Sequence, residues 1–239
     1  MIGFLSDVGM VRNLNEDSLC YHECEDYCIY VVADGMGGHN AGEVASKMAA
    51  EGIVEYIKIN FYNEGCSDIL KKAIEKVNTD IYIHSMKEKK LSGMGTTVTA
   101  ALVVNNKIIV ANVGDSSCLA SKGDNLVKIT KDHSLVQELV DLGTITEVEA
   151  ANHPRKNIIT RAVGTSDFVD VDIFVIDEGT YDIYLLCSDG LTNELTKEEI
   201  VSTINKEKNP VTICNKLVNL AKYKGGRDNI TVLLFGGER

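Results

Sequence analysis

Short turns between strand-like segments constrain the fold of this chain more than any other feature. Two runs rich in Val, Ile and Thr, Thr96–Val104 and Lys107–Val113, are separated only by Asn105 and Asn106. A two-residue connection is too short for the helical crossover that parallel strands require, so these strands should pair antiparallel. The turn at Lys122–Asn125 favours the same arrangement further along the chain. The sequence therefore predicts antiparallel sheets.

The remaining apolar segments divide into strands and helices by their periodicity. Further strands are predicted at Tyr27–Ala33, Leu126–Thr130, Val169–Ile176, Asp182–Cys187 and Asn229–Phe235. Helices are predicted at Ala41–Ile57, Ile69–His84, Ser134–Leu142, Lys197–Ile204 and Val211–Tyr223, and the first two should form an antiparallel hairpin. Pairs of helices between blocks of strands favour an α+β fold, with sheets packed inside layers of helices.

Length and composition limit the classes of protein that remain. The 239 residues, 44% hydrophobic, are expected to form a single domain, 1–239, and a monomer is the default expectation. The net charge of −11 disfavours nucleic acid and anionic membrane surfaces as partners. Without a leader-like or membrane-spanning segment, we expect a cytoplasmic protein. The weakly periodic segment at about 143–164 is interpreted as a mobile surface flap.

The seven cysteines do not form a metal-binding or disulfide pattern. Cys20, Cys24 and Cys28 are four residues apart, but Ser18–Tyr30 is predicted to be a hairpin with Cys24 at its tip. We therefore expect reduced thiols that pack as small hydrophobic groups.

Three aspartates stand next to predicted strands. Two directly follow apolar runs, and the third lies in a glycine-rich turn just before a strand-like segment. They occur in the pairs Asp34-Gly35, Asp189-Gly190 and Asp228-Asn229. Each Asp-Gly pair alone is most simply a turn. Converging carboxylates, however, would raise one another's pKa unless a hard cation neutralised them, and oxygen ligands favour Mg²⁺ or Mn²⁺. The pattern indicates a metal site at the strand ends.

Seven motifs in order extend this interpretation to almost the whole chain. They are Ser6–Asp17, Ala33–Ser46, Gly93–Thr97, Asn112–Ser116, Thr130–Ser134, Cys187–Leu191 and Gly225–Val232. In this order and spacing they resemble the PPM, or type 2C, family of metal-dependent protein phosphatases, in its bacterial branch. The resemblance implies a four-layer αββα fold: a sandwich of two antiparallel sheets flanked by pairs of helices, with the metal site at one end.

The resemblance also implies ligands for two Mn²⁺ or Mg²⁺ ions. Asp34 matches the carboxylate that bridges both ions, and Gly35 matches the residue whose backbone carbonyl binds one of them. Asp189 and Asp228 match the other side-chain ligands. Asp115, with Asp189, resembles the site of a third ion in bacterial members, although a turn aspartate is the alternative.

Three residues near the amino terminus match supporting roles in the family. Glu16 and Asp17 resemble residues that hold metal-bound waters. Arg12 resembles the phosphate-binding arginine, whose planar fork can meet two phosphate oxygens. A surface salt bridge is the alternative interpretation for Arg12.

The resemblance implies hydrolysis of phosphoserine and phosphothreonine in proteins by a metal-bridging hydroxide, without a covalent phosphoenzyme. The chain would then oppose a bacterial serine/threonine kinase, and phosphorylated proteins would be its substrates. A narrower target, such as one regulatory phosphoprotein, remains open from sequence. A catalytically silent binding module is the third reading, and the intact carboxylates argue against it.

Two positions depart from the family pattern. Met36 stands where many relatives outside the bacterial branch have a histidine that could protonate the leaving group; His39 or a metal-bound water could act instead, although a structural role is preferred for His39. Ser117 stands where the family usually has arginine, a change that removes no ligand of the two-metal core.

A histidine and a basic patch near the predicted flap complete the candidates. His133 is expected to be structural, just before a helix that Asp132 or Ser134 could cap. Arg155, Lys156 and Arg161 are most simply solvated, and the sharper hypothesis is that they recruit an anionic phosphopeptide.

Overall fold

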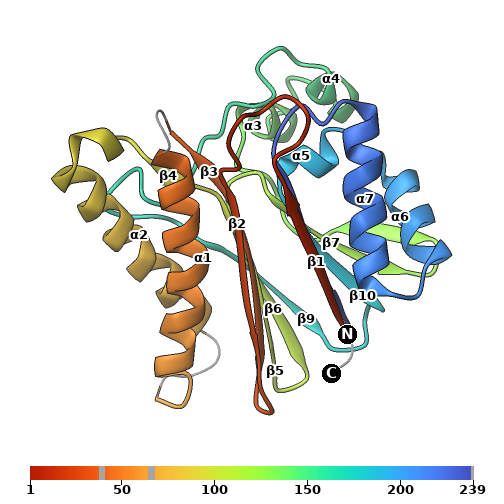
Figure 1. The fold of residues 1–239 in the computed structure, drawn as a ribbon, viewed down its shortest axis with the longest axis horizontal. Coiled ribbons are helices and arrows are strands. Elements are labelled where there is room, and N and C mark those ends of the chain that lie inside the picture. Colours follow the sequence, from red (N-terminus) through yellow and green to blue (C-terminus); the bar gives the residue numbers. More distant parts are fainter. Residues whose placement is uncertain (38–40, 64–67, 238–239) are drawn as a thin grey trace.

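Two antiparallel sheets form the centre of the molecule in a computed structural model that describes residues 1–37, 41–63 and 68–237 (Figure 1). The five-stranded sheet has the order β1 (Ile2–Asp7), β11 (Ile230–Gly236), β10 (Ile183–Cys187), β7 (Ser117–Lys122) and β8 (Asn125–Lys128). The six-stranded sheet contains β2 (Asp17–Glu23), β3 (Cys28–Met36), β5 (Val98–Val104), β6 (Lys107–Val113) and β9 (Asp172–Asp177), with β4 (Gly95–Thr96) paired to β3. The predicted antiparallel arrangement is confirmed.

The β5–β6 hairpin shows why the shortest turn was informative. Asn105 and Asn106 have φ angles of 50° and 59°, and Val104 pairs directly with Lys107. Two consecutive residues with positive φ match the twist of the flanking strands, and asparagine tolerates this conformation better than most residues. The turn thus fixes the register of two central strands.

Aromatic side chains fill the space between the two sheets. Tyr30 of β3 stacks on Phe235 of β11 with ring centroids 4.3 Å apart, and Tyr184 of β10 stacks on the same ring at 5.3 Å. All three side chains are buried, together with Val32 and Leu186. Burial of such large rings from both sheets holds the sandwich closed.

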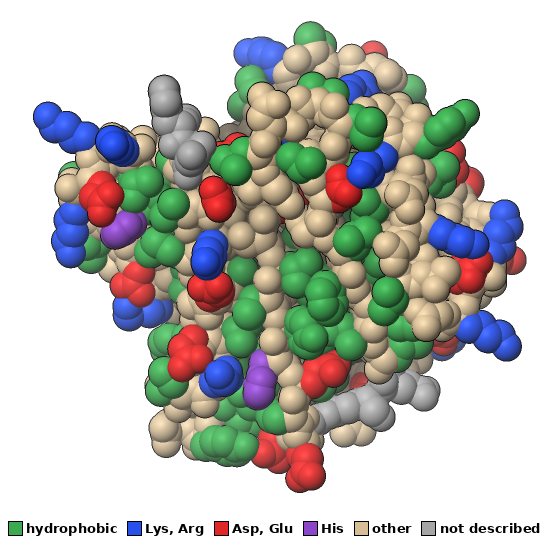
Figure 2. All heavy atoms as spheres, viewed as in Figure 1, with side chains coloured by type: hydrophobic (Ala, Val, Ile, Leu, Met, Phe, Trp, Pro, Cys, Tyr) green, Lys and Arg blue, Asp and Glu red, His purple; other side chains and the backbone are tan. Residues whose placement is uncertain are grey.

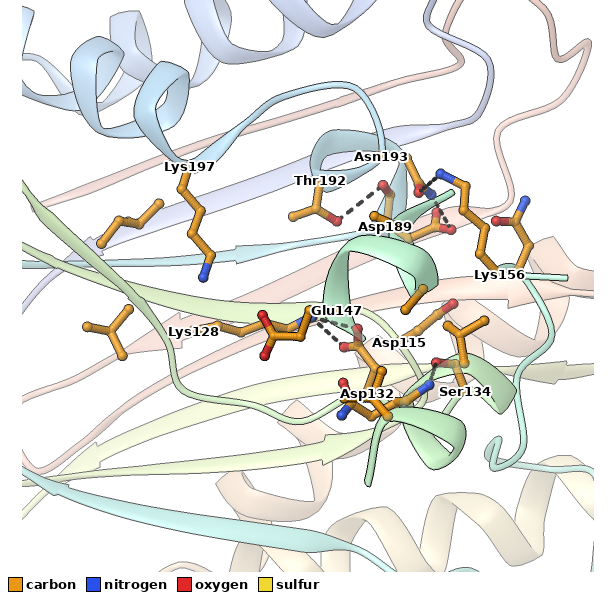
Figure 3. Close-up of a pocket in the computed structure, with 18 residues that line it drawn as sticks. Asp115, Lys128, Asp132, Ser134, Glu147, Lys156, Asp189, Thr192, Asn193 and Lys197 are labelled. Carbon is orange, nitrogen blue, oxygen red and sulfur yellow. Dashed lines mark hydrogen bonds and ion pairs between the residues drawn. The ribbon is translucent and has the colours of Figure 1, made fainter. Parts of the chain in front are cut away.

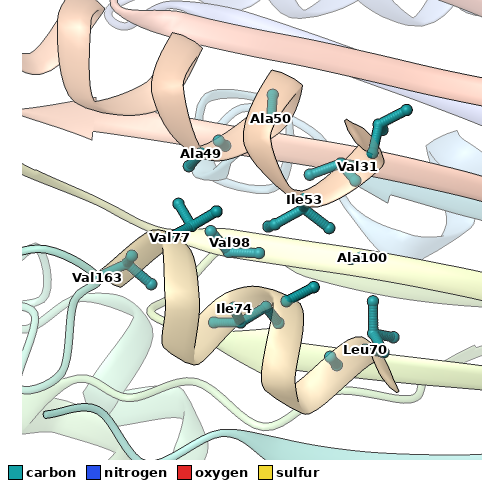
Figure 4. Packing of buried hydrophobic residues seen from close by; sticks show 14 of the residues in the cluster. Val31, Ala49, Ala50, Ile53, Leu70, Ile74, Val77, Val98, Ala100 and Val163 are labelled. Atoms are coloured by element: carbon teal, nitrogen blue, oxygen red, sulfur yellow. The ribbon is translucent and has the colours of Figure 1, made fainter. Parts of the chain in front are cut away.

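Two long helices cover the outer face of the six-stranded sheet (Figure 1). They are α1 (Ala41–Asn60) and α2 (Ile69–Lys87), which pack against each other as predicted. Ile53 of α1 and Ile74 of α2 are fully buried in one hydrophobic cluster with Val98 of the sheet (Figure 4). This cluster forms the first helical layer.

Three further helices cover the five-stranded sheet: α5 (Asp189–Thr192), α6 (Lys197–Lys206) and α7 (Pro210–Lys224). Thr196 caps α6 in a capping box with Glu199, and Asn209 caps α7 immediately before Pro210. These caps satisfy amide groups that the first helical turn leaves free, which explains where both helices begin. The predicted α+β fold with four layers is confirmed.

The face between the free edges of the sheets is partly apolar. Figure 2 shows hydrophobic side chains gathered over β1 and β2, and Phe4 and Tyr21, 42% and 38% exposed, lie with ring centroids 5.3 Å apart. None of the helices in the described ranges combines the length and apolar content that a membrane span requires.

The segment between the sheets' edges at residues 134–171 contains two short helices, α3 (Leu135–Asp141) and α4 (Glu147–Ala151). Ser134 caps α3, as expected, whereas α4 lies inside the predicted flap and was missed. Isolated bridges join Ser134 to Ile159 and Thr96 to Val163, so the far end of the flap segment is attached to the body. The flap's mobility and the single-domain boundary remain predictions.

Candidate active site

Four aspartates from both sheets meet at one end of the sandwich. Asp34 lies near the end of β3 and is directly paired in register with Asp17 at the start of β2. Asp189 is the first residue of α5, just after β10, and Asp228 stands two residues before β11. The ends of four strands therefore position these carboxylates, and the sequence pattern predicts this place for three of them, Asp34, Asp189 and Asp228.

The glycines beside two of these aspartates are not turn residues. Gly35 lies within β3, where an added Cβ would stand 2.2 Å from the carbonyl oxygen of Gly42 and 2.5 Å from that of Glu16. At Gly190 a Cβ would stand 2.0 Å from the carbonyl oxygen of Asn229. Such contacts are far inside van der Waals distance, so both glycines allow backbone segments to approach closely around the carboxylates.

Asp17 connects the two sheets across the sandwich. Its Oδ2 accepts a hydrogen bond of 2.7 Å from the hydroxyl of Ser188, and Ser188 Oγ in turn accepts the amide of Thr231 at 3.0 Å. The other oxygen, Oδ1, is buried without a partner in the structure. Burial raises the pKa of Asp17 to about 7, and the nearby charges of Asp189 and Asp228 act in the same direction.

The surroundings of the neighbouring carboxylates also disfavour their ionised forms. Burial, followed by the charges of Asp17 and Asp189, holds the pKa of Asp34 well above its ordinary value. Burial also raises the pKa of Asp115 to about 7 and that of Asp189 to about 6. Asp115 Oδ1 is buried without a hydrogen-bond partner. Several crowded carboxylates with unpartnered oxygens fit the ligand set of hard divalent cations.

Asp228 forms an ion pair with Arg12. Arg12 Nη2 lies 2.8 Å from Asp228 Oδ2, while Oδ1 accepts the amide of Asn229 at 2.9 Å. In the described ranges, no group of three or more His, Cys, Asp or Glu side chains is gathered closely enough to hold a metal ion as it stands. The arginine thus partly neutralises the charge of this acidic site.

Asn229 holds the amino-terminal loop over this site. Its side-chain amide donates to the carbonyl oxygens of Val8 and Leu14 at 3.0 and 2.9 Å, and its Oδ1 accepts the amide of Glu16 at 2.8 Å. Arg12 lies within the loop that these bonds anchor. Sequence analysis did not assign Asn229 this role, because its partners are more than 200 residues away.

A cleft beside the aspartates runs between β8, α3, α4 and the start of α6, with a volume of about 770 Å³ (Figure 3). Asp189 and Asp115 line it, as does Lys156 from the predicted flap. The ammonium of Lys156 donates to Asn193 Oδ1 at 2.9 Å, and Asn193 Nδ2 donates to Asp189 Oδ2 at 2.9 Å. A flap residue is thereby linked to a predicted ligand through one asparagine, which sequence analysis missed.

His133 and Arg161 have structural contacts. His133 Nδ1 accepts the amide of Gly114 at 3.0 Å, and Arg161 Nη1 pairs with Asp172 Oδ1 at 2.7 Å. The second ring nitrogen of His133 lies 3.1 Å from the other oxygen of Asp172. The structural interpretation of His133 agrees with these contacts. Arg161 is paired with Asp172, which weakens the alternative hypothesis that Arg161 helps to recruit a phosphopeptide.

The metal-free site has a measurable pH dependence. The folded-state pKa of Asp115, about 7, lies above its unfolded value of 3.8. The protonated Asp115 therefore stabilises the protein fully below about pH 4, and this stabilisation is lost as the pH rises through about 7. We therefore expect the Asp115→Asn variant, stripped of metal, to lose less stability between pH 4.5 and 7.5 than the native chain does. Chemical denaturation across that range would measure the difference, and identical slopes for both proteins would contradict the assignment.

Comparison with known proteins identifies the family of this chain. Residues 11–215 match the family model described as protein phosphatase 2C. The chain belongs to this family. The serine/threonine phosphatase stp of Listeria innocua is 41% identical over 97% of this chain and 93% of the relative, and the protein phosphatase PhpP of Streptococcus pneumoniae is 34% identical over 98% and 96%.

Solved structures of phosphatases are similar over the same length. The serine/threonine phosphatase PstP/Ppp of Mycobacterium tuberculosis covers 100% of this chain and 99% of its own, at 35% identity and a TM-score of 0.88. Stp1 of Staphylococcus aureus gives a TM-score of 0.88 at 36% identity, over 98% and 93% of the two chains. The predicted recognition and the prediction of a metal-dependent protein serine/threonine phosphatase are confirmed.

The two departures from the protein phosphatase 2C pattern differ in their surroundings. Met36 is half-buried at the end of β3, beside Gly95 of β4. Ser117 is fully buried at the start of β7, and its hydroxyl has no hydrogen-bond partner. His39, the other histidine considered as an acid, and Cys66 lie outside the described residues.

Proposed function

We propose that this phosphatase hydrolyses phosphoserine and phosphothreonine in proteins, with two Mn²⁺ or Mg²⁺ ions held by Asp34, Asp189 and Asp228 and by the carbonyl of Gly35. A third ion would be held through Asp115 and Asp189. The observation that carries the proposal is the group of buried carboxylates with raised pKa values at one end of the sandwich, next to a half-exposed arginine.

The cations would supply charge neutralisation and activation of a water nucleophile. Residues of the chain fix the positions of the carboxylates that would hold the cations. Ser188 and the paired strands fix Asp17 and Asp34, and Asn193 orients Asp189 through its 2.9 Å hydrogen bond. Glu16 and Asp17 would orient waters around the cations.

Arg12 would bind the phosphoryl group of the substrate. Its side chain is 51% exposed, its Nη2 pairs with Asp228, and the charges of Glu16 and Asp34 also act on its guanidinium. When a cation takes the charge of Asp228, the guanidinium would be free to meet two phosphoryl oxygens of the substrate. The same side chain therefore has one partner in the metal-free site and another in the substrate complex.

The wider partners follow from this chemistry. Phosphorylated proteins are the substrates, and we propose that the kinase which phosphorylates them is a serine/threonine kinase whose action this enzyme reverses. We propose a monomer that acts in the cytoplasm; one copy of the chain is sufficient for the reaction, because it supplies all the residues named above.

The first test is phosphate release from a phosphothreonine peptide. Protein stripped of metal should be inactive, and Mn²⁺ should restore turnover in the native chain but not in Asp228→Asn, which loses a charged ligand. We expect a difference of at least about 10³-fold, since cation stabilisation of the transition state amounts to several kcal/mol. Folded native protein that stays inactive with every divalent ion would instead support the silent binding module.

A further inference from the structure

An ion pair outside the ligand set joins two segments that carry proposed ligands. Glu194 follows α5, the helix that begins with Asp189, and Arg227 immediately precedes Asp228. Arg227 Nε donates to Glu194 Oε1 at 2.8 Å, and Nη2 donates to Oε2 at 3.0 Å. The backbone amide of Arg227 also donates to Oε1, at 3.2 Å. One carboxylate thus accepts three hydrogen bonds from a single residue.

The burial of the pair is unequal. The side chain of Glu194 is only 3% exposed, whereas that of Arg227 is 69% exposed. Hydrogen bonding to Arg227 lowers the pKa of Glu194, so the buried group remains a carboxylate at neutral pH. An exposed partner is weakly held in water, and such a pair contributes little to stability by charge alone. The geometry of the ion pair therefore indicates that it positions the backbone around Arg227.

The backbone that Glu194 contacts needs an external support. Gly225 and Gly226 have φ angles of 154° and 52°, and a Cβ at Gly225 would stand 3.1 and 3.2 Å from the two oxygens of Glu194. Two consecutive glycines leave this loop many alternative conformations. The carboxylate lies against the loop and restricts it just before Asp228.

The same loop also contacts the segment that carries Arg12. The carbonyl oxygen of Gly226 accepts the amide of Met10 at 2.7 Å. A shift of the glycine loop would therefore displace Asp228 and its partner Arg12 together. Glu194, two residues after α5, holds the same loop through its hydrogen bonds with Arg227.

We propose that Glu194 and Arg227 are positioning residues that fix Asp228 relative to Asp189 and thereby set the affinity of the site for its divalent cation. The proposal rests on the proposed function, because it assumes that both aspartates are ligands. Groups that orient metal ligands commonly change metal affinity by about 10- to 100-fold when they are removed. Neither residue was singled out by sequence analysis.

The test is Mn²⁺ binding to metal-stripped protein, measured by isothermal titration calorimetry. Glu194→Gln keeps the shape of the side chain but removes its charge, and we expect its Kd for Mn²⁺ to rise at least about tenfold. Phosphatase activity at saturating Mn²⁺ should recover to near the native kcat, because the ligands themselves remain. A role in stability alone would not produce this separation between metal affinity and kcat.

The matched control is Asp177→Asn, which removes the same charge from the exposed ion pair with Lys107, where Nζ and Oδ1 are 2.6 Å apart at the far end of β6 and β9. Its Kd should stay within twofold of the native value. If Glu194→Gln does not fold, Arg227→Lys gives a second test, because lysine keeps the charge but loses the fork.

The outcomes separate this inference from the proposed function. If the native chain binds Mn²⁺ and folded Glu194→Gln has the same Kd, only this inference is overturned. The same holds for Arg227→Lys where that variant replaces Glu194→Gln. No binding of Mn²⁺ by the native chain would overturn the proposed function and this inference with it. A raised Kd in the variant and an unchanged Kd in Asp177→Asn would support it.

Discussion

Replacing Asp34 with asparagine should reduce phosphate release by at least about 10³-fold while making the metal-free protein more stable. Activity falls because the proposed bridging ligand loses its charge, and neutralisation by the cations is worth several kcal/mol in the transition state. Stability rises because burial and the charges of Asp17 and Asp189 disfavour the ionised form of this side chain. A neutral side chain of the same shape removes that penalty.

Thermal unfolding of metal-stripped protein at pH 7.5 would measure the second effect. We expect the Tm of Asp34→Asn to rise by a few degrees, since a chain of this length gains roughly 2–4 °C per kcal/mol. Added Mn²⁺ should raise the Tm of the native chain but not that of the variant. Asp177→Asn, which removes an exposed carboxylate far from the site, is the control and should change neither activity nor metal response. A variant that loses activity and stability together would show that Asp34 is merely structural.

Arg12→Ala should lower kcat/KM by about 10²-fold without weakening metal binding. The expected loss is that of a charge-assisted, two-pronged contact with a phosphoryl group. Metal binding should be retained or improved, because the 2.8 Å bond from Arg12 to Asp228 competes with a cation for the same carboxylate. Steady-state kinetics with a phosphothreonine peptide and calorimetry with Mn²⁺ would measure the two quantities separately.

Arg12→Lys provides the matched variant for this prediction. Lysine keeps the positive charge but cannot form the planar fork, so its kcat/KM should lie between those of the native chain and the alanine variant. If both variants bound Mn²⁺ more weakly and kept the native kcat/KM at saturating metal, the arginine would act on the metal site and not on the substrate.

Segments with a strong hydrophobic periodicity could be predicted from the sequence. Strands that form only because they pair with a neighbouring strand could not. The runs at Lys107–Val113 and Ala41–Ile57 have strong patterns that determine their own structure, and β6 and α1 begin at the same residues. By contrast, β1 contains Gly3, and β7 consists largely of small residues. Both are strands because β11 and β10 pair with them, which is a property of the assembled sheet.

The candidate site divides in the same way. Asp34, Asp189 and Asp228 could be predicted as candidate ligands, because each stands in a recognisable local motif next to a strand. The supporting contacts of Asn229, Asn193 and Glu194 could not, because their partners lie far away in sequence or depend on the geometry of the flap. A single sequence contains no signal for such non-local pairs. The Asp-Gly pairs show the limit most clearly, since their glycines serve close backbone packing and not turns.

The central claim, that these aspartates hold the catalytic cations, is tested most directly by locating Mn²⁺ in crystals of the protein. The account predicts anomalous scattering peaks between Asp34, Asp189 and Asp228, with Asp34 in contact with two ions and the guanidinium of Arg12 displaced from Asp228. Crystals saturated with Mn²⁺ that showed ions only elsewhere, with the bond between Arg12 and Asp228 intact, would contradict it.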